Sequence, residues 1–145
     1  MADLVVFAYD GSDLARAAIA EAGRQLGPGR DALAVTVWQP FDVGFVPARE
    51  LEINAAQTED VRRAAAQTAA EGAALAEAAG FHAEGMEINA APTWKAVVDV
   101  AERRNASLIV LGSHGRTGLP GVLLGSVAGA VAAHSGRSVL ISHRR

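Results

Sequence analysis

Residues 108–116 read LIVLGSHGR, and this stretch decides the fold. Its first four residues, 108–111, are all apolar, which is typical of a strand buried on both faces of a parallel sheet. Gly112 ends the apolar run, and Gly115 follows within the same loop. Glycines at the end of a strand let the backbone come close to a ligand. We therefore predict a buried strand that leads directly into a binding loop.

The loop ends at a second glycine signal, after nine intervening residues. Gly125 and Ser126 stand there, at the start of a predicted helix over 126–134. Free amides and the helix dipole attract anions to the start of a helix, and the hydroxyls of Ser113 and Ser126 add hydrogen-bond donors. The arrangement predicts a cradle for phosphate across this loop.

Apolar runs and helical patterns alternate along the rest of the chain. The predicted strands are 4–9, 32–38, 81–88, 108–111 and 138–142, and the predicted helices are 14–26, 58–79, 92–104 and 126–134. Strands that alternate with helices indicate an α/β fold, here a single open, mostly parallel five-stranded sheet with helices on both faces, Rossmann-like and doubly wound. A chain of 145 residues has the size of one domain, so we expect a single domain over 1–145.

In such a sheet, ligands bind outside the carboxyl ends of the strands, where the direction of winding reverses. The predicted strand ends place loops 10–13 and 112–126 there. Asp10 has two compatible interpretations, as the N-cap of the first helix or as a ligand contact. Segment 41–57 has mixed polarity and no steady period, which predicts a mobile loop over the sheet edge. Pro92 is predicted in the first turn of its helix.

Composition argues against several classes of function. Lysine and arginine number 13 against 16 acidic residues, for a formal net charge of -3, so no basic surface for nucleic acid is indicated. Cysteine is absent, which excludes disulfides and thiolate chemistry. No leader is visible before the first strand, and the uncharged run 117–134 contains Pro120 and is short for a membrane span. We expect a cytoplasmic protein that binds neither nucleic acid nor membranes.

Other phosphate-binding and catalytic arrangements fit the sequence poorly. Residues 10–12, DGS, stand where a dinucleotide fingerprint needs its first glycines. A P-loop needs lysine between glycine and serine, which 125–126 lacks, and Lys95 is the only lysine. His114 lies in the cradle loop without a readable nucleophile, and we interpret it as a solvated histidine that shapes the turn. No catalytic residue and no metal-ligand cluster is predicted.

The glycine pattern resembles that of the nucleotide-binding branch of the universal stress protein family. Members of that branch carry Gly-x-x-Gly, nine residues, and then Gly followed by Ser or Thr. Here the pattern is Gly112, Gly115, residues 116–124, Gly125 and Ser126, without a gap. The resemblance also covers DGS at 10–12, LIVLGSHGR at 108–116, LLGSV at 123–127 and VLI at 139–141, and so it spans the chain.

The resemblance implies a ligand and a role for each matching residue. Asp10 is expected to contact the nucleoside half, and the backbone of Val37 to meet the adenine. The expected phosphate and ribose contacts are Gly112, Gly115, Gly125, Ser126 and Val127. Arg116 lies in the cradle, where it can contact a phosphate. The implied ligand is ATP, ADP or AMP, with any Mg²⁺ held mainly by the phosphates.

Three functions stay open. The first is an ATP- or AMP-binding sensor or switch of the stress response, the second is a slow ATP hydrolase, and the third is a homodimeric, chaperone-like interaction protein with a structural pocket. The complete glycine motif favours the first two functions over the third, and the lack of a readable general base favours the sensor over the hydrolase.

If strand 138–142 lies at a sheet edge, as in the resembled family, its unpaired backbone is a template for a second copy of the chain. We therefore expect a homodimer through this strand.

Overall fold

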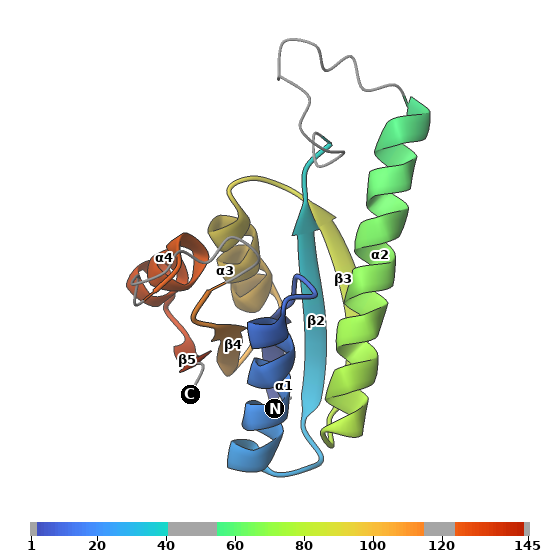
Figure 1. Ribbon diagram of the computed structural model, residues 1–145. Helices are drawn as coiled ribbons and strands as arrows, with labels where there is room; N and C mark the ends of the chain where they lie inside the picture. The colour runs from blue at the N-terminus through green and yellow to red at the C-terminus, as the bar shows by residue number, and fades with distance from the viewer. Residues whose placement is uncertain (1–2, 41–54, 115–123, 144–145) are drawn as a thin grey trace.

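The computed structural model describes residues 3–40, 55–114 and 124–143. Within them, five strands form one parallel sheet in the order β3-β2-β1-β4-β5 (Figure 1). The strands are β1 (Leu4–Ala8), β2 (Asp31–Trp38), β3 (His82–Asn89), β4 (Leu108–Gly112) and β5 (Ser138–Ser142). The helices are α1 (Asp13–Leu26), α2 (Ala55–Ala78), α3 (Thr93–Arg103) and α4 (Ser126–His134). The predicted α/β class, with an open, doubly wound sheet, is confirmed.

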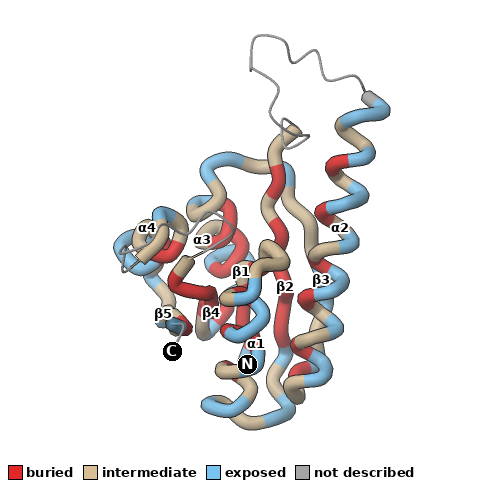
Figure 2. The backbone as a smooth tube through the Cα atoms, viewed as in Figure 1, coloured by how far each residue is buried: buried red, intermediate tan, exposed pale blue. Residues whose placement is uncertain are grey.

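Helices cover both faces of the sheet and bury two separate layers of apolar side chains. α1 and α2 pack on one face, and α3 and α4 pack on the other (Figure 1). Successive residues of β1 point to opposite faces, so Phe7 packs with α1 and α2 while Val6 packs with α3 and α4. The buried residues follow β1, β2 and β4 (Figure 2). Burial on both faces explains why these strands are continuous apolar runs in the sequence.

The two edges of the sheet differ from its centre. β3 pairs with β2 on one side and β5 pairs with β4 on one side. In β3, His82, Glu84 and Asn89 are exposed, and the central residues of β5 are half-buried. The edge position of β3 accounts for its weak apolar pattern. The predicted strand 138–142 does lie at an edge, so the condition attached to the dimer expectation is met.

Most predicted boundaries differ from the observed ones by one residue, and the differences at the starts of α2 and α3 have a physical reason. α2 begins at Ala55, so the last three residues of the predicted loop 41–57 are helical, and the rest of that loop, 41–54, lies outside the described residues. The sequence predicts Thr58 as the N-cap of this helix. Residues 55–57 are alanine, alanine and glutamine, which are good helix formers, so the helix begins upstream of Thr58. Pro92 is the N-cap of α3 and not part of its first turn, because its backbone is extended, with ψ 158°.

Candidate functional site

The winding of the sheet reverses between β1 and β4. The chain passes from β1 through α1 to β2 and then to β3 on one side, and from β4 through α4 to β5 on the other. β1 and β4 are neighbours in the sheet, with Val6 opposite Ile109. A crevice is expected outside the carboxyl ends of strands at such a point. Residues 10–12 follow β1 and residues 113–114 follow β4 at this position, within the two loops that the sequence singled out.

Asp10 and Ser12 shape the loop after β1. The Asp10 carboxylate accepts the amide of Ser12 at 2.9 Å, and the Ser12 hydroxyl accepts the amide of Ala15 at 3.2 Å. Ser12 is therefore the N-cap of α1, and the capping role left open for Asp10 is wrong. Asp10 holds the turn that precedes the cap, at the carboxyl end of β1.

Gly112 allows the two loops to approach each other. A Cβ at this position would lie 2.9 Å from both the carbonyl carbon and the Cβ of Leu14, in the first turn of α1. A Cβ does not approach backbone atoms this closely, so the end of β4 accepts only glycine without a shift of α1. From its place after the strand, this glycine was expected to allow the approach of a ligand. The approach that the structure shows is that of helix α1.

Ser113 joins three segments at the carboxyl end of β4. Its amide donates to the carbonyl of Ser142 in β5 at 2.8 Å, and its carbonyl accepts the amide of Gly125 at 2.6 Å. The residue is only 3% exposed, and its hydroxyl lies 3.2 Å from Nδ1 of His114. Ser113 therefore fixes the start of α4 against the ends of β4 and β5.

The start of α4 is an uncapped helix N-terminus. Gly125 is the N-cap and offers no side chain to the helix, and the first bond within the helix runs from the amide of Gly129 to the carbonyl of Gly125. The amides of Ser126, Val127 and Ala128 have no acceptor within α4, because the first turn of any helix lacks one. Free amides and the positive end of the helix dipole are the features that attract an anion to a helix N-terminus.

Gly125 stands in a confined place at this N-terminus. A Cβ there would lie 3.2 Å from the carbonyl oxygen of Ser113 and 3.3 Å from Cα of His114. Of the other predicted cradle residues, Gly115 and Arg116 lie outside the described residues. The structure therefore brings Gly112, Gly125 and the first turn of α4 together around the end of β4.

His114 differs from its interpretation as a solvated loop residue. Its Nε2 atom is buried and has no hydrogen-bond partner within the part of the chain that the structure describes. Its Cδ2 atom lies 3.7 Å from the place that a Cβ on Gly125 would occupy. The Nε2 and Cδ2 edge of the ring therefore packs against the start of α4, while the residue as a whole is half-buried.

Val37 lies near the carboxyl end of β2, beside the crevice. β2 pairs with β1 as far as Val35, opposite Ala8, and then continues to Trp38 beside β3. Val37 packs toward α3 and α4, whereas Trp38 is buried against Val61 and Ala65 of α2. β2 therefore extends past the end of β1, next to the Asp10 turn. At this end of β2, the hydroxyl of Thr36 donates to the carbonyl of Tyr9 at 2.8 Å.

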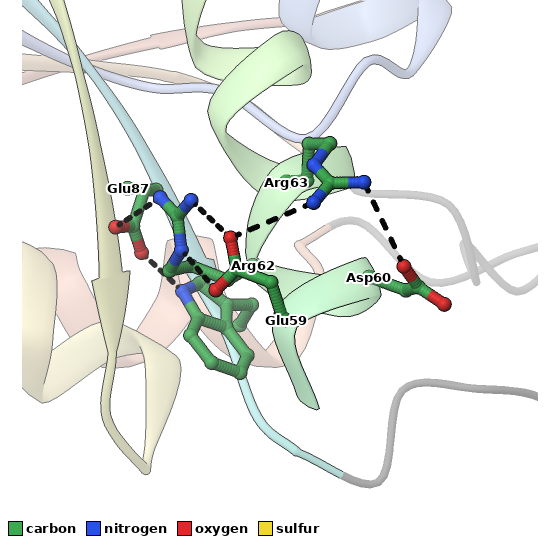
Figure 3. A network of polar contacts seen from close by, with 6 residues as sticks. Glu59, Asp60, Arg62, Arg63 and Glu87 are labelled. Carbon is green, nitrogen blue, oxygen red and sulfur yellow. Dashed lines mark hydrogen bonds and ion pairs between the residues drawn. The ribbon is translucent and has the colours of Figure 1, made fainter. Parts of the chain in front are cut away.

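An ionic network joins the start of α2 to the ends of β2 and β3 (Figure 3). Arg62 donates to both carboxylate oxygens of Glu59, at 2.9 and 2.5 Å, and lies 3.6 Å from the carboxylate of Glu87. Glu87 in turn accepts the indole N–H of Trp38. The hydrogen bonds from Arg62 lower the pKa of Glu59 below its ordinary value. Sequence reasoning missed this network because its members come from three elements and carry no shared motif.

The described residues offer no alternative metal or membrane site. Across 3–40, 55–114 and 124–143, no group of three histidine or acidic side chains is arranged to hold a metal ion. No helix in those ranges combines the length and apolar character that a membrane crossing requires. The end of β4 and the start of α4, at the winding reversal, are therefore the candidate site within the described part of the chain.

The sequence profile of the universal stress protein family matches residues 1–143. The chain belongs to the universal stress protein family. The resemblance drawn from the glycine motif is thus confirmed at the level of the family.

Solved structures of universal stress proteins share this fold. One, a universal stress protein in complex with cAMP, is 30% identical, with 98% of this chain and 97% of that chain covered and a TM-score of 0.65. UspA from Lactobacillus plantarum is 20% identical over 95% of each chain, with a TM-score of 0.72. The universal stress protein from Archaeoglobus fulgidus in complex with dAMP is 19% identical over 97% of each chain, with a TM-score of 0.65. No curated protein matches the chain at a significant level.

Proposed function

We propose that this universal stress protein binds adenine nucleotides in the crevice between β1 and β4 and acts as a cytoplasmic sensor or switch, its 145 residues forming one nucleotide-binding domain. One observation carries the proposal: the uncapped N-terminus of α4 is fixed against β4 where the winding of the sheet reverses. Its amides and dipole are suited to a phosphate. The similar universal stress protein that holds cAMP supports an adenine nucleotide as the ligand.

Two features of the described residues fit a phosphate at α4. Gly125 keeps this N-terminus close to the end of β4, because a Cβ there would meet the Ser113 carbonyl at 3.2 Å. The buried Nε2 of His114 lacks a partner among the described residues, and a phosphate oxygen supplies one. In this proposal Ser126 and Val127 bind the phosphate through their amides, and Gly115 and Arg116 complete the cradle.

The nucleoside half fits the ends of β1 and β2. The step that β2 forms beyond β1 exposes backbone near Val37, and Asp10 provides a carboxylate at the neighbouring turn. We assign the adenine to Val37 and the ribose to Asp10. The ligand is then ATP, ADP or AMP, and any Mg²⁺ that accompanies it is held mainly by the phosphates.

Two alternatives have observations behind them. A slow ATP hydrolase uses the same site, where the buried Ser113 hydroxyl lies 3.2 Å from Nδ1 of His114. Among the described residues no third group orients that histidine through its other nitrogen, so we place the hydrolase second. A homodimeric, chaperone-like protein uses the open edge of β5, which pairs with β4 on one side alone. The net charge of -3 gives no support to a nucleic-acid partner.

Two alanine substitutions in one helix test the proposed site. Gly125→Ala adds a Cβ 3.2 Å from the Ser113 carbonyl and displaces the start of α4, whereas a Cβ at Gly129 meets nothing within 4 Å. We expect Gly125→Ala to weaken AMP and ATP binding by about tenfold or more, in line with the cost of overpacking. Gly129→Ala should keep the affinity and stabilise the helix by up to about 1 kcal/mol.

Isothermal titration calorimetry on the folded variants measures both affinities. The wild-type protein is titrated in parallel with ATP, AMP and adenosine. Equal affinities for the two alanine variants, or a wild-type protein that binds no adenine nucleotide, would contradict the proposed function.

A further inference from the structure

The end of β2 has fewer strand neighbours than the rest of that strand. The ladder with β1 stops where Ala8 lies opposite Val35, whereas the ladder with β3 continues until Trp38 lies opposite Asn89. Among the described strands, residues 36–38 therefore have a neighbour on one side alone. The position of their backbone then depends strongly on the contacts that their side chains make.

Val37 directs its backbone groups toward the candidate site. The carbonyl of Val35 accepts the amide of Tyr9 at 2.9 Å, and the carbonyl of Trp38 accepts the amide of Ala90, directly after β3, at 3.2 Å. Because backbone groups alternate along a strand, those of Val37 point to the same side as those of Val35. They lie past the last pair of the β1 ladder. The Val37 carbonyl is the acceptor that this position offers to the 6-amino group of an adenine.

The side chain of Trp38 anchors this end of β2 to α2 and β3. The residue is 5% exposed and packs against Val61 and Ala65 of α2. Its indole N–H donates to the carboxylate of Glu87, near the end of β3. A buried indole N–H needs such an acceptor, and its loss leaves a polar group unpaired. Because Val37 and Trp38 are adjacent in the chain, an anchor on Trp38 also fixes the backbone of Val37.

Arg62 holds the Glu87 carboxylate in place. Its guanidinium lies 3.6 Å from that carboxylate and donates to both oxygens of Glu59, at 2.9 and 2.5 Å (Figure 3). A planar guanidinium with a bidentate partner has little freedom to turn, which fixes its second contact as well. One chain of contacts therefore runs from the first turns of α2, through β3, to the end of β2.

From these contacts we infer that Glu87 and Arg62 are positioning residues for adenine recognition, which act through Trp38 on the backbone of Val37. The inference rests on the proposed function, because it explains how the adenine-reading backbone of the same site is held. Adenine offers an amino donor to the Val37 carbonyl, whereas hypoxanthine has a carbonyl oxygen at the same ring position. We expect the wild-type protein to bind AMP at least about tenfold more tightly than inosine monophosphate (IMP).

Variants of Glu87 and Trp38 test the anchor. Glu87→Ala and Trp38→Phe each remove the indole hydrogen bond, and we expect each to weaken AMP binding by about fivefold or more and IMP binding by less than about twofold. Glu87→Gln keeps a carbonyl oxygen for the indole N–H, and its AMP affinity should stay within about twofold of wild type. Glu84→Ala is the matched control, because Glu84 is exposed on the same strand, and it should change neither affinity.

Two neighbouring arginines of α2 test the outer part of the chain of contacts. Arg62 reaches Glu87, whereas the ion pairs of Arg63 are with Glu59 and Asp60. We expect Arg62→Met to lower the ratio of AMP to IMP affinity by about threefold, and Arg63→Met to leave it unchanged. Equal ratios in the two variants would overturn the role given to Arg62.

Isothermal titration calorimetry with AMP and IMP separates this inference from the proposed function. A wild-type protein that binds neither nucleotide overturns both. A wild-type protein that binds AMP no better than IMP overturns this inference alone, and so does an unchanged affinity ratio in Glu87→Ala and Trp38→Phe. Equal losses for AMP and IMP also overturn it, because they indicate a purely structural role.

Hydrogen exchange of the indole N–H tests the same coupling on the unmodified chain. Coupling is reciprocal, so if the Trp38 hydrogen bond strengthens AMP binding, bound AMP strengthens that hydrogen bond by the same factor. We expect saturating AMP to slow exchange of the Trp38 indole by about fivefold, with the other tryptophan, Trp94, as the internal reference. Trp94→Phe assigns the two signals. If AMP slows Trp38 no more than Trp94, the inference is overturned even where the Glu87 variants fail to fold.

Discussion

Tyr9 connects the helices of one face of the sheet to the edge of the candidate site. It directly precedes Asp10, is 2% exposed, and its hydroxyl donates to the Glu71 carboxylate of α2 at 2.7 Å. Arg16 of α1 donates to the same hydroxyl at 3.3 Å and lies 2.8 Å from Glu71. The three side chains therefore tie α1 and α2 to the turn at the end of β1.

The Tyr9 contact makes a prediction about the ionisation of Glu71. The hydrogen bond from Tyr9, and then the charge of Arg16, hold the pKa of Glu71 below its ordinary value of 4.5. Because the folded pKa is depressed, the contact stabilises the protein fully above pH 4.5 and loses its effect as pH falls through the folded pKa. In Tyr9→Phe the carboxylate loses that donor, and we expect the pKa of Glu71 to rise toward 4.5.

Carbon-13 NMR titration of the Glu71 carboxyl measures this pKa in both proteins. Thermal melts from pH 7 to pH 3 provide the second readout, and wild type should lose its advantage over Tyr9→Phe as the solution is acidified. A Glu71 pKa that is the same in both proteins would contradict the assigned cause.

The glycines of the cradle show what the sequence can and cannot predict at the scale of a residue. Their spacing identified the positions of Gly112 and Gly125 but not what their backbones approach. Gly112 meets the first turn of α1, and Gly125 meets the carbonyl of Ser113. Both contacts are between segments distant in the chain, and a periodicity argument carries no information about them. Asp10 was one candidate for the cap of α1, and Ser12 takes that place two residues later in the same turn.

β5 exposes one set of backbone groups at the edge of the sheet. The carbonyl of Ser142 accepts the amide of Ser113, so residue 142 directs its backbone groups toward β4. Because backbone groups alternate along a strand, Leu140 also faces β4, and Val139 and Ile141 face the open edge. A second copy of the chain would pair with the groups of Val139 and Ile141.

Proline substitutions separate dimerisation from folding. Val139→Pro removes an amide on the open edge, where proline is tolerated, and we expect a folded monomer. Leu140→Pro removes an amide that pairs with β4, and we expect an unfolded protein. Sedimentation equilibrium with circular dichroism measures both properties. The wild-type chain should be a dimer, and a wild-type monomer at high micromolar concentration would refute the proposed pairing.

Secondary structure was largely predictable because its signals are local. The continuous apolar runs of β1, β2 and β4 result from burial on both faces, and the capping and glycine signals bound α1. The start of α2 was missed because Ala55, Ala56 and Gln57 carry no stop signal. The Arg62 network was not predictable, because its ion pairs depend on how α2 lies across β2 and β3.

At the scale of the whole molecule, the order of the strands determines where a ligand can bind. The sequence predicted five alternating units and placed the site at the loops after the first and fourth strands. The order β3-β2-β1-β4-β5 makes those strands neighbours and puts the winding reversal between them. The sequence did not contain this order, which depends on long-range packing of the helices. It did contain the glycine motif, because those residues lie close together in the chain.

Amide NMR during a titration with ATP tests the central claim most directly, because it reports both binding and its location. We expect the largest shifts at Ser126 and Val127 of α4, and smaller shifts at Ser12 and Val37, with the amides of β3 unchanged. Adenosine should move Ser12 and Val37 but not the start of α4. A spectrum unchanged at millimolar ATP, or shifts that leave Ser126 and Val127 unaffected, would contradict the proposed nucleotide site.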